Sequence, residues 1–310
     1  MRKILVMFLV VLALLTMAQE CQTGTDEGDL TNPFVGGQQG LQITFEEDRP
    51  PESVTDGDSW PFYVELILKN MGESYIEGED VNIQLSGLQA DSFGVTDADL
   101  IKKGIDQDIF AVEKEEGRTI EPAEVYVTFG EFNYLPDISQ NYGPFDIRAE
   151  VCYKYSTQAV ALGCVLRNPT DPPEQAYCEV SGEKNIYNSG APLQVSNFVE
   201  SASGSNRIKY VFTIEHVGPG RFFSPDSGCS DKLRSENKVH FSIDSNVANL
   251  NCQPGIGGKE GEIYLGRDGK ADVSCIQQTE SGSDFLDQIR IKLTYDYLQT
   301  QEVPLLVKAD

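Results

Sequence analysis

The sequence predicts an all-β protein: two tandem immunoglobulin-like antiparallel β-sandwich domains that follow an N-terminal signal or anchor segment. A strand-like segment occurs twice, 142 residues apart, with Ile-Arg followed by two tyrosines at the same spacing, in residues 147–155 and 289–297. Segments that alternate apolar and polar residues and end at turn residues fill both halves of the chain, whereas helical periodicity is rare. A duplicated unit of this length is typical of two domains of one fold.

The N-terminus has the layout of an export signal. The chain begins Met-Arg-Lys, and the sixteen residues 4–19 carry no charge. A basic start before a short apolar run is typical of a signal peptide, and the run is shorter than the ~20 residues of a free-standing membrane span. We therefore expect residues 1–20 to be a signal peptide or membrane anchor. Cleavage after Ala18, a lipid on Cys21 and an uncleaved anchor all remain open, and all three export the rest of the chain.

The first sandwich is expected over residues 41–166, after a flexible acidic tether of residues 21–40 that is rich in Gly, Thr, Asp, Glu and Gln. Its expected strands are residues 41–45, 62–68, 81–85, 125–129 and 145–155. The insertion 86–120 interrupts this order, and apolar residues at helical spacing predict one short helix within residues 97–109.

The second half repeats this order. A linker is expected over residues 167–190, because the Pro- and Asp-rich stretch 168–173 cannot continue a central strand. The second sandwich then covers residues 191–310. Its expected strands are residues 193–195, 210–214, 239–243, 263–265, 271–273, 289–297 and 303–307. Asp268-Gly269 is a two-residue turn signal, so residues 263–265 and 271–273 are expected to form a hairpin.

Aromatic residues in the expected strands are interpreted as core or sheet-face packing rather than as ligand contacts. This interpretation covers Trp60, Phe62, Tyr126, Phe129, Tyr210 and Phe212.

The charge of the chain is strongly acidic and unevenly distributed. The chain has 24 Lys and Arg against 49 Asp and Glu, a net charge of −25. Residues 22–165 carry a net charge of −20 and residues 193–310 only −4. Phosphate groups would be repelled, which argues against nucleic acid as a partner. A protein or glycan at the cell surface is the expected partner, and the membrane is reached only through the N-terminus.

The cysteines agree with export. Of the seven, Cys21 is a candidate lipid anchor, and the remaining six are an even number, which suits disulfides in an extracytoplasmic protein. Residues 153–163 could double back as a hairpin between two cysteines, both absent from the second copy, and two more cysteines flank the 268–269 turn. The last pair follows by elimination. The expected pairs are Cys152–Cys164, Cys252–Cys275 and Cys178–Cys229.

Metal binding and catalysis receive little support from the sequence. Asp56 and Asp58, in an Asp-Gly-Asp motif, could bind calcium together with the acidic insertion, but no EF-hand spacing is present and the motif is also a common turn. Neither His216 nor His240 adjoins a nucleophile motif. We therefore expect no catalytic residues and no cofactor other than calcium. A secreted hydrolase would need two facing carboxylates in a cleft.

The segment 57–72 adds a resemblance. It has a Gly-Asp lead-in, alternating apolar residues and a Lys-Asn-x-Gly end, and it resembles the opening of cell-adhesion-related (CARDB-type) immunoglobulin-like modules. The whole chain also resembles predicted surface and secreted proteins of archaea. The second copy departs from the motif, because His216-Val217-Gly218 replaces Asn-x-Gly.

The resemblance implies a non-catalytic surface or adhesion module. We therefore expect an exported cell-surface protein with an envelope-structural or adhesion role. The alternative is a calcium-dependent carbohydrate- or adhesion-type binding module that uses the acidic loops of the first domain.

Overall fold

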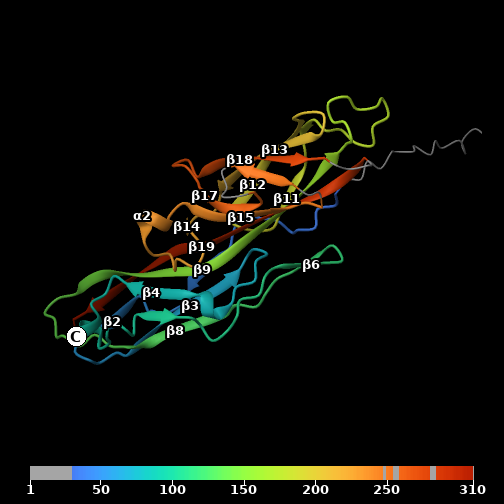
Figure 1. Cartoon of the computed structure of the whole chain (residues 1–310). Helices are drawn as coiled ribbons and strands as arrows, with labels where there is room; N and C mark the ends of the chain where they lie inside the picture. Colours follow the sequence, from blue (N-terminus) through green and yellow to red (C-terminus); the bar gives the residue numbers. More distant parts are fainter. Residues whose placement is uncertain (1–29, 247–248, 254–257, 280–283, 310) are drawn as a thin grey trace, which may run out of the picture.

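The molecule is an elongated all-β protein in which two sandwich-like bodies share one long ribbon (Figure 1). The ribbon consists of β9 (Tyr142–Val165) and β19 (Phe285–Lys308), which pair antiparallel over their whole length. The predicted all-β fold of antiparallel sandwiches is confirmed. The computed structural model describes residues 30–246, 249–253, 258–279 and 284–309.

The first body lies at the lower end of Figure 1 and consists of two facing sheets. One sheet has the order β1 (Leu41–Phe45), β3 (Phe62–Asn70), β8 (Val125–Phe132). The other contains β2 (Ser53–Thr55), β4 (Asn82–Ser86), β5 (Ile101–Lys103), the first part of β9 and the last part of β19. The connections carry two 3-10 turns, η1 (Gly78–Asp80) and η2 (Ala90–Phe93), and the hairpin of β6 (Glu113–Glu115) and β7 (Arg118–Ile120).

The second body repeats this plan at the other end of the ribbon. One sheet has the order β10 (Gly182–Glu183), β12 (Leu193–Ala202), β13 (Arg207–His216), β18 (Lys270–Gln278), β16 (Leu250–Gln253). The facing sheet contains β11 (Ile186–Asn188), β14 (Arg221–Phe223), β15 (Lys238–Asp244), β17 (Glu260–Tyr264), the first part of β19 and the last part of β9. The short helix α2 (Lys232–Ser235) precedes β15.

The strands form where apolar residues alternate with polar ones. In β15, for example, Val239, Phe241 and Ile243 are buried while the residues between them are less so. The period of two matches a strand with one face on the core. Buried residues from both bodies belong to one continuous hydrophobic core.

Each long strand serves both bodies. β9 pairs with β4 near its start and with β11 near its end, and β19 pairs first with β15 and finally with β2. We expected each half of the chain, residues 41–166 and 191–310, to complete its own sandwich. Instead, each half contributes a strand end to the other body. The expected linker, residues 167–190, follows the far end of β9 and does not separate the bodies.

The repeated segments of the sequence pair with each other at the centre of this ribbon. Tyr155 lies opposite Tyr295, and Lys154 lies opposite Asp296. Lys154 and Asp296 hold the same place in the two copies of the repeat, so the register is that of a two-fold axis between them. The duplication is therefore visible in space as two similar bodies arranged around this point.

Four buried tyrosines surround the axis, with neighbouring ring centroids 5.7 to 6.3 Å apart. The hydroxyl of Tyr155 donates to Asn70 Oδ1 at 3.1 Å, and the hydroxyl of Tyr297 lies 3.0 Å from His216 Nε2. Asn70 and His216 end the equivalent strands β3 and β13. We call these residues the tyrosine quartet: Tyr153, Tyr155, Tyr295 and Tyr297.

Glycines make room for these hydroxyls. A Cβ atom at Gly72 would lie 2.2 Å from the Tyr155 hydroxyl oxygen, and one at Gly218 would lie 2.6 Å from that of Tyr297. Contacts this short exclude any side chain. The repeated tyrosines thus pack against the ends of two equivalent strands. These ends are Asn-x-Gly at β3 and His-Val-Gly at β13.

Two local predictions are wrong. Residues 97–109 contain no helix, because the segment forms β5 and turns against the first body. The turn at Gly266–Lys270 is present, with Gly269 N donating to Gly266 O at 2.9 Å. However, β17 pairs with β15 and β18 pairs with β13, so this turn connects two sheets and does not close a hairpin.

The six cysteines other than Cys21 are all bonded, but only one expected pair is correct. Cys252 and Cys275 lie opposite each other on β16 and β18. The expected pair Cys152–Cys164 is wrong because both residues lie on one continuous strand. Twelve extended residues place them roughly 40 Å apart. The pair obtained by elimination, Cys178–Cys229, is therefore also wrong, because Cys152 and Cys164 lie far apart on β9 and each bonds one of these two cysteines. The observed bonds are Cys152–Cys229, Cys164–Cys178 and Cys252–Cys275.

The Cys152–Cys229 bond joins the two halves beside the axis. Asp296 accepts hydrogen bonds from Gly228 N at 2.7 Å and Asp226 N at 3.1 Å, which holds the loop that carries Cys229. Lys154 Nζ in turn lies 2.6 Å from Asp226 Oδ1. Three disulfides indicate an extracytoplasmic protein.

The N-terminal predictions are tested only in part. Residues 1–20 and Cys21 lie outside the described residues. Within the described part of the expected tether, Glu73 accepts the backbone N–H groups of Val35 and Gly36 at 2.9 and 2.8 Å. This part is therefore bound to the protein surface. No helix among the described residues has the length and hydrophobicity to cross a membrane.

Candidate functional site

A groove of about 660 Å³ lies at the junction of the two bodies, next to the tyrosine quartet. We call it the waist groove. It is formed by residues 33–34, the residues that follow β3, the β6 hairpin and the middle of β9. Its lining includes Phe34, Glu73, Ser74, Tyr75, Val112, Lys114, Ser156, Gln158 and Ser189.

Two exposed aromatic rings stand beside the waist groove. Tyr75 is 46% exposed and Phe110 is 61% exposed, and their centroids lie 5.6 Å apart in an edge-to-face arrangement. The antiparallel bridge between Ile76 and Ile109, both fully buried, fixes the backbone beneath them. The hydroxyl of Tyr75 donates to Asp108, and this bond raises the pKa of Tyr75 to about 12. The pair is thus held rigidly while it remains open to solvent.

The polar lining includes two exposed carboxylates, Glu113 and Glu115, while its other members are uncharged or already hydrogen-bonded. Ser74 Oγ lies 2.9 Å from Ser156 Oγ, close to the amide of Gln158. The carboxylate of Glu73 accepts Gly190 N at 2.7 Å in addition to the N–H groups of Val35 and Gly36. Lys114 Nζ donates to the carbonyl oxygens of Asn32 and Phe34 at 2.9 and 3.0 Å. The groove therefore offers aromatic faces, hydroxyls and an amide on a fixed backbone.

The predicted calcium residues lie elsewhere, in a turn at the far end of the first body. Asp56 is 5% exposed, and its Oδ2 accepts the N–H of Ile138 at 2.7 Å. Asp58, with φ of 58°, accepts a hydrogen bond from the Asn133 amide. Both carboxylates stabilise the turn and its neighbouring loop.

The acidic insertion also uses carboxylates to hold its own backbone. Asp99 accepts Thr96 N at 2.8 Å, and Asp108 accepts Gly78 N at 2.8 Å. Hydrogen bonds from Thr96 lower the pKa of Asp99, and those from Gly78 and Tyr75 lower the pKa of Asp108. Among the described residues, no group of three or more His, Cys, Asp and Glu side chains is placed to hold a metal ion.

The histidines lie in unrelated surroundings. His216 packs against Phe222 and Tyr297 at the tyrosine quartet, where burial lowers its pKa. His240 lies on β15, opposite Thr294 of β19. A catalytic relay would place a nucleophile and an orienting carboxylate next to the histidine, whereas the rings that pack against His216 are those of Phe222 and Tyr297.

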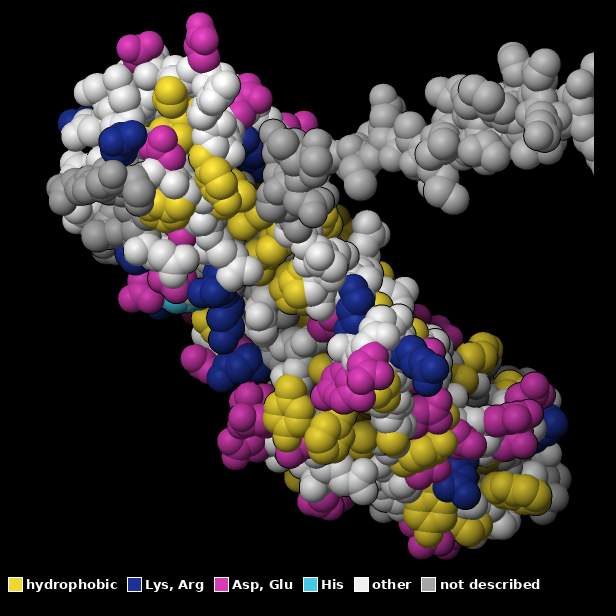
Figure 2. Space-filling view, turned by 90° about the vertical axis from the view of Figure 1, so that its right-hand side faces the viewer, with side chains coloured by type: hydrophobic (Ala, Val, Ile, Leu, Met, Phe, Trp, Pro, Cys, Tyr) yellow, Lys and Arg dark blue, Asp and Glu magenta, His cyan; other side chains and the backbone are white. Residues whose placement is uncertain are grey.

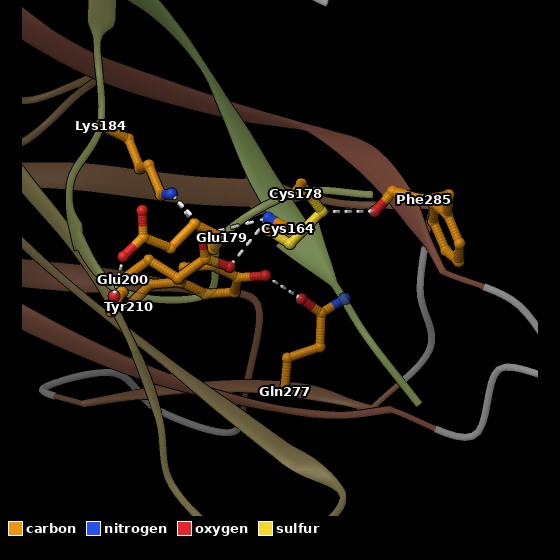
Figure 3. Close-up of polar contacts among 9 residues, drawn as sticks. Cys164, Cys178, Glu179, Lys184, Glu200, Tyr210, Gln277 and Phe285 are labelled. Atoms are coloured by element: carbon orange, nitrogen blue, oxygen red, sulfur yellow. Dashed lines mark hydrogen bonds and ion pairs between the residues drawn. A yellow bond between two sulfur atoms is a disulfide. The ribbon is translucent and has the colours of Figure 1, made fainter. Parts of the chain in front are cut away.

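A buried carboxylate in the second body has the perturbed pKa that often marks active sites. Glu200 on β12 is fully buried, and it accepts the backbone N–H of Cys164 at 2.9 and 3.1 Å. Lys184 Nζ lies 3.6 Å away (Figure 3). Burial raises the pKa of Glu200 to about 7, although the Cys164 N–H and the Lys184 ammonium oppose this rise.

The same interior contains a chain of polar contacts. Tyr210, opposite Glu200, donates to Gln277 Oε1 at 2.8 Å (Figure 3), and Gln277 Nε2 donates to Ser245 Oγ at 2.6 Å. Ser245 in turn donates to the buried carboxylate of Asp287 at 2.5 Å. Because Glu200 and Asp287 have no exposed surface, a substrate cannot reach them. This network is structural.

Sequence reasoning missed the waist groove. Most of the aromatics expected in the core are buried, but Trp60 and Tyr126 are 54% and 53% exposed. The groove residues are spread from residue 33 to residue 189, and no periodicity distinguishes Tyr75 from a buried aromatic. The one signal in the sequence is the departure of residues 73–76 from the strand alternation that ends at Asn70.

Comparisons with known proteins give no family. No family model and no curated protein matches the chain. The chain is similar to envelope protein VP37 from White Spot Syndrome Virus, with 8% identity and a TM-score of 0.25, over 46% of this chain and 97% of that one. It is also similar to red sea bream transglutaminase, with 12% identity and a TM-score of 0.18, over 86% of this chain and 31% of that one.

A third solved structure, the collagen adhesin of S. aureus, has 8% identity and a TM-score of 0.11, over 90% of this chain and 96% of that one. Similarities of this size do not identify a function. The resemblance of residues 57–72 to adhesion-related modules stays a prediction.

Proposed function

We propose that the protein is a non-catalytic, exported component of a cell surface that binds a neutral glycan through the waist groove. The observation that carries this proposal is the rigid, exposed pair of Tyr75 and Phe110 beside a groove of hydroxyls and an amide. Sugar rings present apolar C–H faces and hydroxyls together, which this lining matches. The net charge of −25 would repel an anionic glycan.

The framework suits a structural or adhesive role outside the cell. Two disulfides close loops in the second body and the third joins the two halves beside the axis, which restricts the unfolded chain. Val35 and Gly36, in the described part of the expected tether, are held at the waist by Glu73. Membrane attachment through a lipid on Cys21 or an uncleaved residues 1–20 is part of the proposal. Mass spectrometry of the mature N-terminus distinguishes these from cleavage after Ala18.

The groove is tested on an array of neutral oligosaccharides with the purified, disulfide-bonded protein. We expect binding that the double variant Tyr75→Ala/Phe110→Ala weakens at least tenfold. Tyr264→Ala, which removes a 58% exposed aromatic of the second body, is the matched control and should bind normally. If the double variant binds every ligand as the unmodified protein does, the waist groove is not the site. Retention of an envelope protein instead of a glycan would favour protein binding.

The calcium-dependent alternative is tested by the same preparation. Asp56, Asp99 and Asp108 already accept backbone hydrogen bonds, so we expect no rise in melting temperature with added calcium. A rise of several degrees that Asp56→Asn abolishes would support the alternative.

A further inference from the structure

The two bodies differ at one edge of equivalent sheets. In the second body, β16 pairs antiparallel with the outer edge of β18, and the Cys252–Cys275 bond joins opposed residues of the two strands. In the first body, β8 is the equivalent of β18. Among the described strands, β8 pairs only with β3, so its outer edge is free.

The difference arises in the connection between equivalent strands. In the second body, the chain between β15 and β17 crosses to the other sheet and forms β16. In the first body, the chain between β4 and β5 forms η2, whose carbonyl oxygens accept the N–H groups of Asn133 and Leu135, beyond the end of β8. In the second body, a short antiparallel strand, β16, thus covers the edge that corresponds to the free edge of β8.

The free edge borders a groove of about 320 Å³. Residues 125–128 of β8 form one side, and Lys102 and residues 104–107 form the other. Val125 and Val127 point into the body, whereas Tyr126 and Thr128 point outward. Edge strands in natural proteins are usually protected by lysine, proline or a covering segment. β8 contains neither residue, and its register shift begins only after Phe129.

The surroundings of this edge are acidic. Tyr126 donates to Glu124 at 3.2 Å; this bond raises the pKa of Tyr126, and the charges of Glu46 and Glu65 raise it further. Lys102 lies over the ring of Phe129 at 5.2 Å, and Asp106 lines the same groove. Figure 2 shows acidic and hydrophobic side chains gathered together over the lower body, which is the first body.

We propose that the edge of β8 from Val125 to Phe129 binds an extended basic peptide segment of a partner protein by strand addition. Main-chain hydrogen bonds to β8 would supply affinity, and alternate side chains would supply specificity. Apolar residues at every second position would enter the groove, as Leu250 and Cys252 of β16 enter the second body. Lysine or arginine at the flanks would face Glu124 and Asp106. This is a second surface, so the inference does not depend on glycan binding at the waist groove.

Charge decides against a second copy of the chain as the occupant. Another copy would bring the same carboxylates to the same edge, and each copy carries a net charge of −25. Like charges brought together across an interface oppose association. A basic segment has the opposite effect and would bind less tightly at high ionic strength.

The probe is a fluorescein-labelled synthetic peptide with the apolar-polar alternation of β16 and two lysines at each end. Binding to the purified full-length protein is measured by fluorescence anisotropy. We expect saturable binding that weakens at least tenfold in Glu124→Lys and on changing the peptide lysines to glutamate. Glu183→Lys, an exposed change on β10, is the matched control and should leave binding unchanged. A peptide with a central proline, which lacks a main-chain donor, should not bind.

Hydrogen exchange locates the contact. We expect peptide binding to protect the amides of residues 125–129 and not those of β16. No binding up to about 1 mM peptide, equal binding of the proline peptide, or protection elsewhere would overturn the proposal. A concentration-dependent dimer in sedimentation velocity that protects the same β8 amides would also overturn it, because the edge would then belong to a second copy.

Discussion

The two bodies of this protein share their centre and differ at their outer surfaces. Each places two tyrosines of the quartet at the axis and leaves a glycine for a tyrosine hydroxyl, Gly72 in the first body and Gly218 in the second. At the periphery, the second body has a covered sheet edge and two carboxylates without exposed surface, Glu200 and Asp287, whereas the first has an open edge and most of the negative charge. Where the two copies pack against each other there is no space for larger side chains, whereas the exposed edges have no such restriction.

The largest effect is expected where the shared centre is broken. In Gly72→Ala, the new Cβ would meet the Tyr155 hydroxyl at 2.2 Å and the carbonyl oxygen of Gly190 at 2.3 Å. Backbone cannot move aside easily, so we expect a loss of about 3 kcal/mol or more in the free energy of unfolding. Gly218→Ala should act similarly in the other body. Urea denaturation measures both.

Gly130→Ala is the matched control, because a Cβ there would meet no atom within 4 Å. We expect a change within about 0.5 kcal/mol. Equal effects at Gly72 and Gly130 would show that the tyrosine hydroxyls do not require the glycine.

A second variant makes the outer edges of the two bodies alike. Cys252→Ser/Cys275→Ser removes the bond that holds β16 on β18, whose cysteines are 23 residues apart. A loop of this size corresponds to about 3 kcal/mol of stability. We expect that loss in urea, with faster hydrogen exchange in β16 than in β13. Unchanged exchange in β16 would mean that its backbone pairing suffices without the bond.

The buried carboxylate of the second body predicts a pH dependence. Burial raises the folded pKa of Glu200 to about 7, so between pH 4.5 and 7 the folded state holds more protons than the unfolded state. Its contribution to stability therefore declines as pH rises through this window, by up to about 3 kcal/mol. Glu200→Gln should be more stable than the unmodified protein at pH 8 but not at pH 4.5.

Glu183→Gln, an exposed change on β10, is the control and should leave the pH profile of stability unchanged. If Glu200→Gln loses stability at pH 8, the ion pair with Lys184 outweighs the cost of burial.

The smallest effect concerns a chemical difference at the centre, where the first body has Asn70 and the second has His216. Asn70 and His216 are equivalent, and each contacts a tyrosine hydroxyl. Burial lowers the folded pKa of His216, so the unfolded state gains its proton first and stability falls as pH drops below about 6.5. His216→Asn gives the second body the residue that the first body has at the equivalent position, and it should remove this loss of stability at low pH. Thermal melts between pH 5 and 7.5 measure it, and an unaltered profile would contradict this role of His216.

Most strands followed from the sequence. The alternation in residues 41–45 predicts β1 at its observed bounds, and residues 239–243 lie within β15. The helix expected in residues 97–109 failed because apolar residues such as Leu100 pack beneath a short strand instead. Of the candidate site residues, Asp56 and Asp58 proved to be turn residues. The waist groove escaped prediction because exposure of Tyr75 and Phe110 depends on segments distant in sequence.

The sequence by itself determined the strand alternation, the duplication, the even set of cysteines and the acidity of the first half. These are local or compositional properties, and a period of two or a repeated motif can be read without knowing what lies opposite. Only the tertiary structure decided that the last strand of each copy crosses into the other body. It thereby also decided the pairing of Cys152 with Cys229 and the free edge of β8. The alternation of apolar and polar residues specifies which side chains of a strand face the core, but it does not specify which strand lies beside it. The sequence therefore does not show whether a strand ends within its own body or continues into the other.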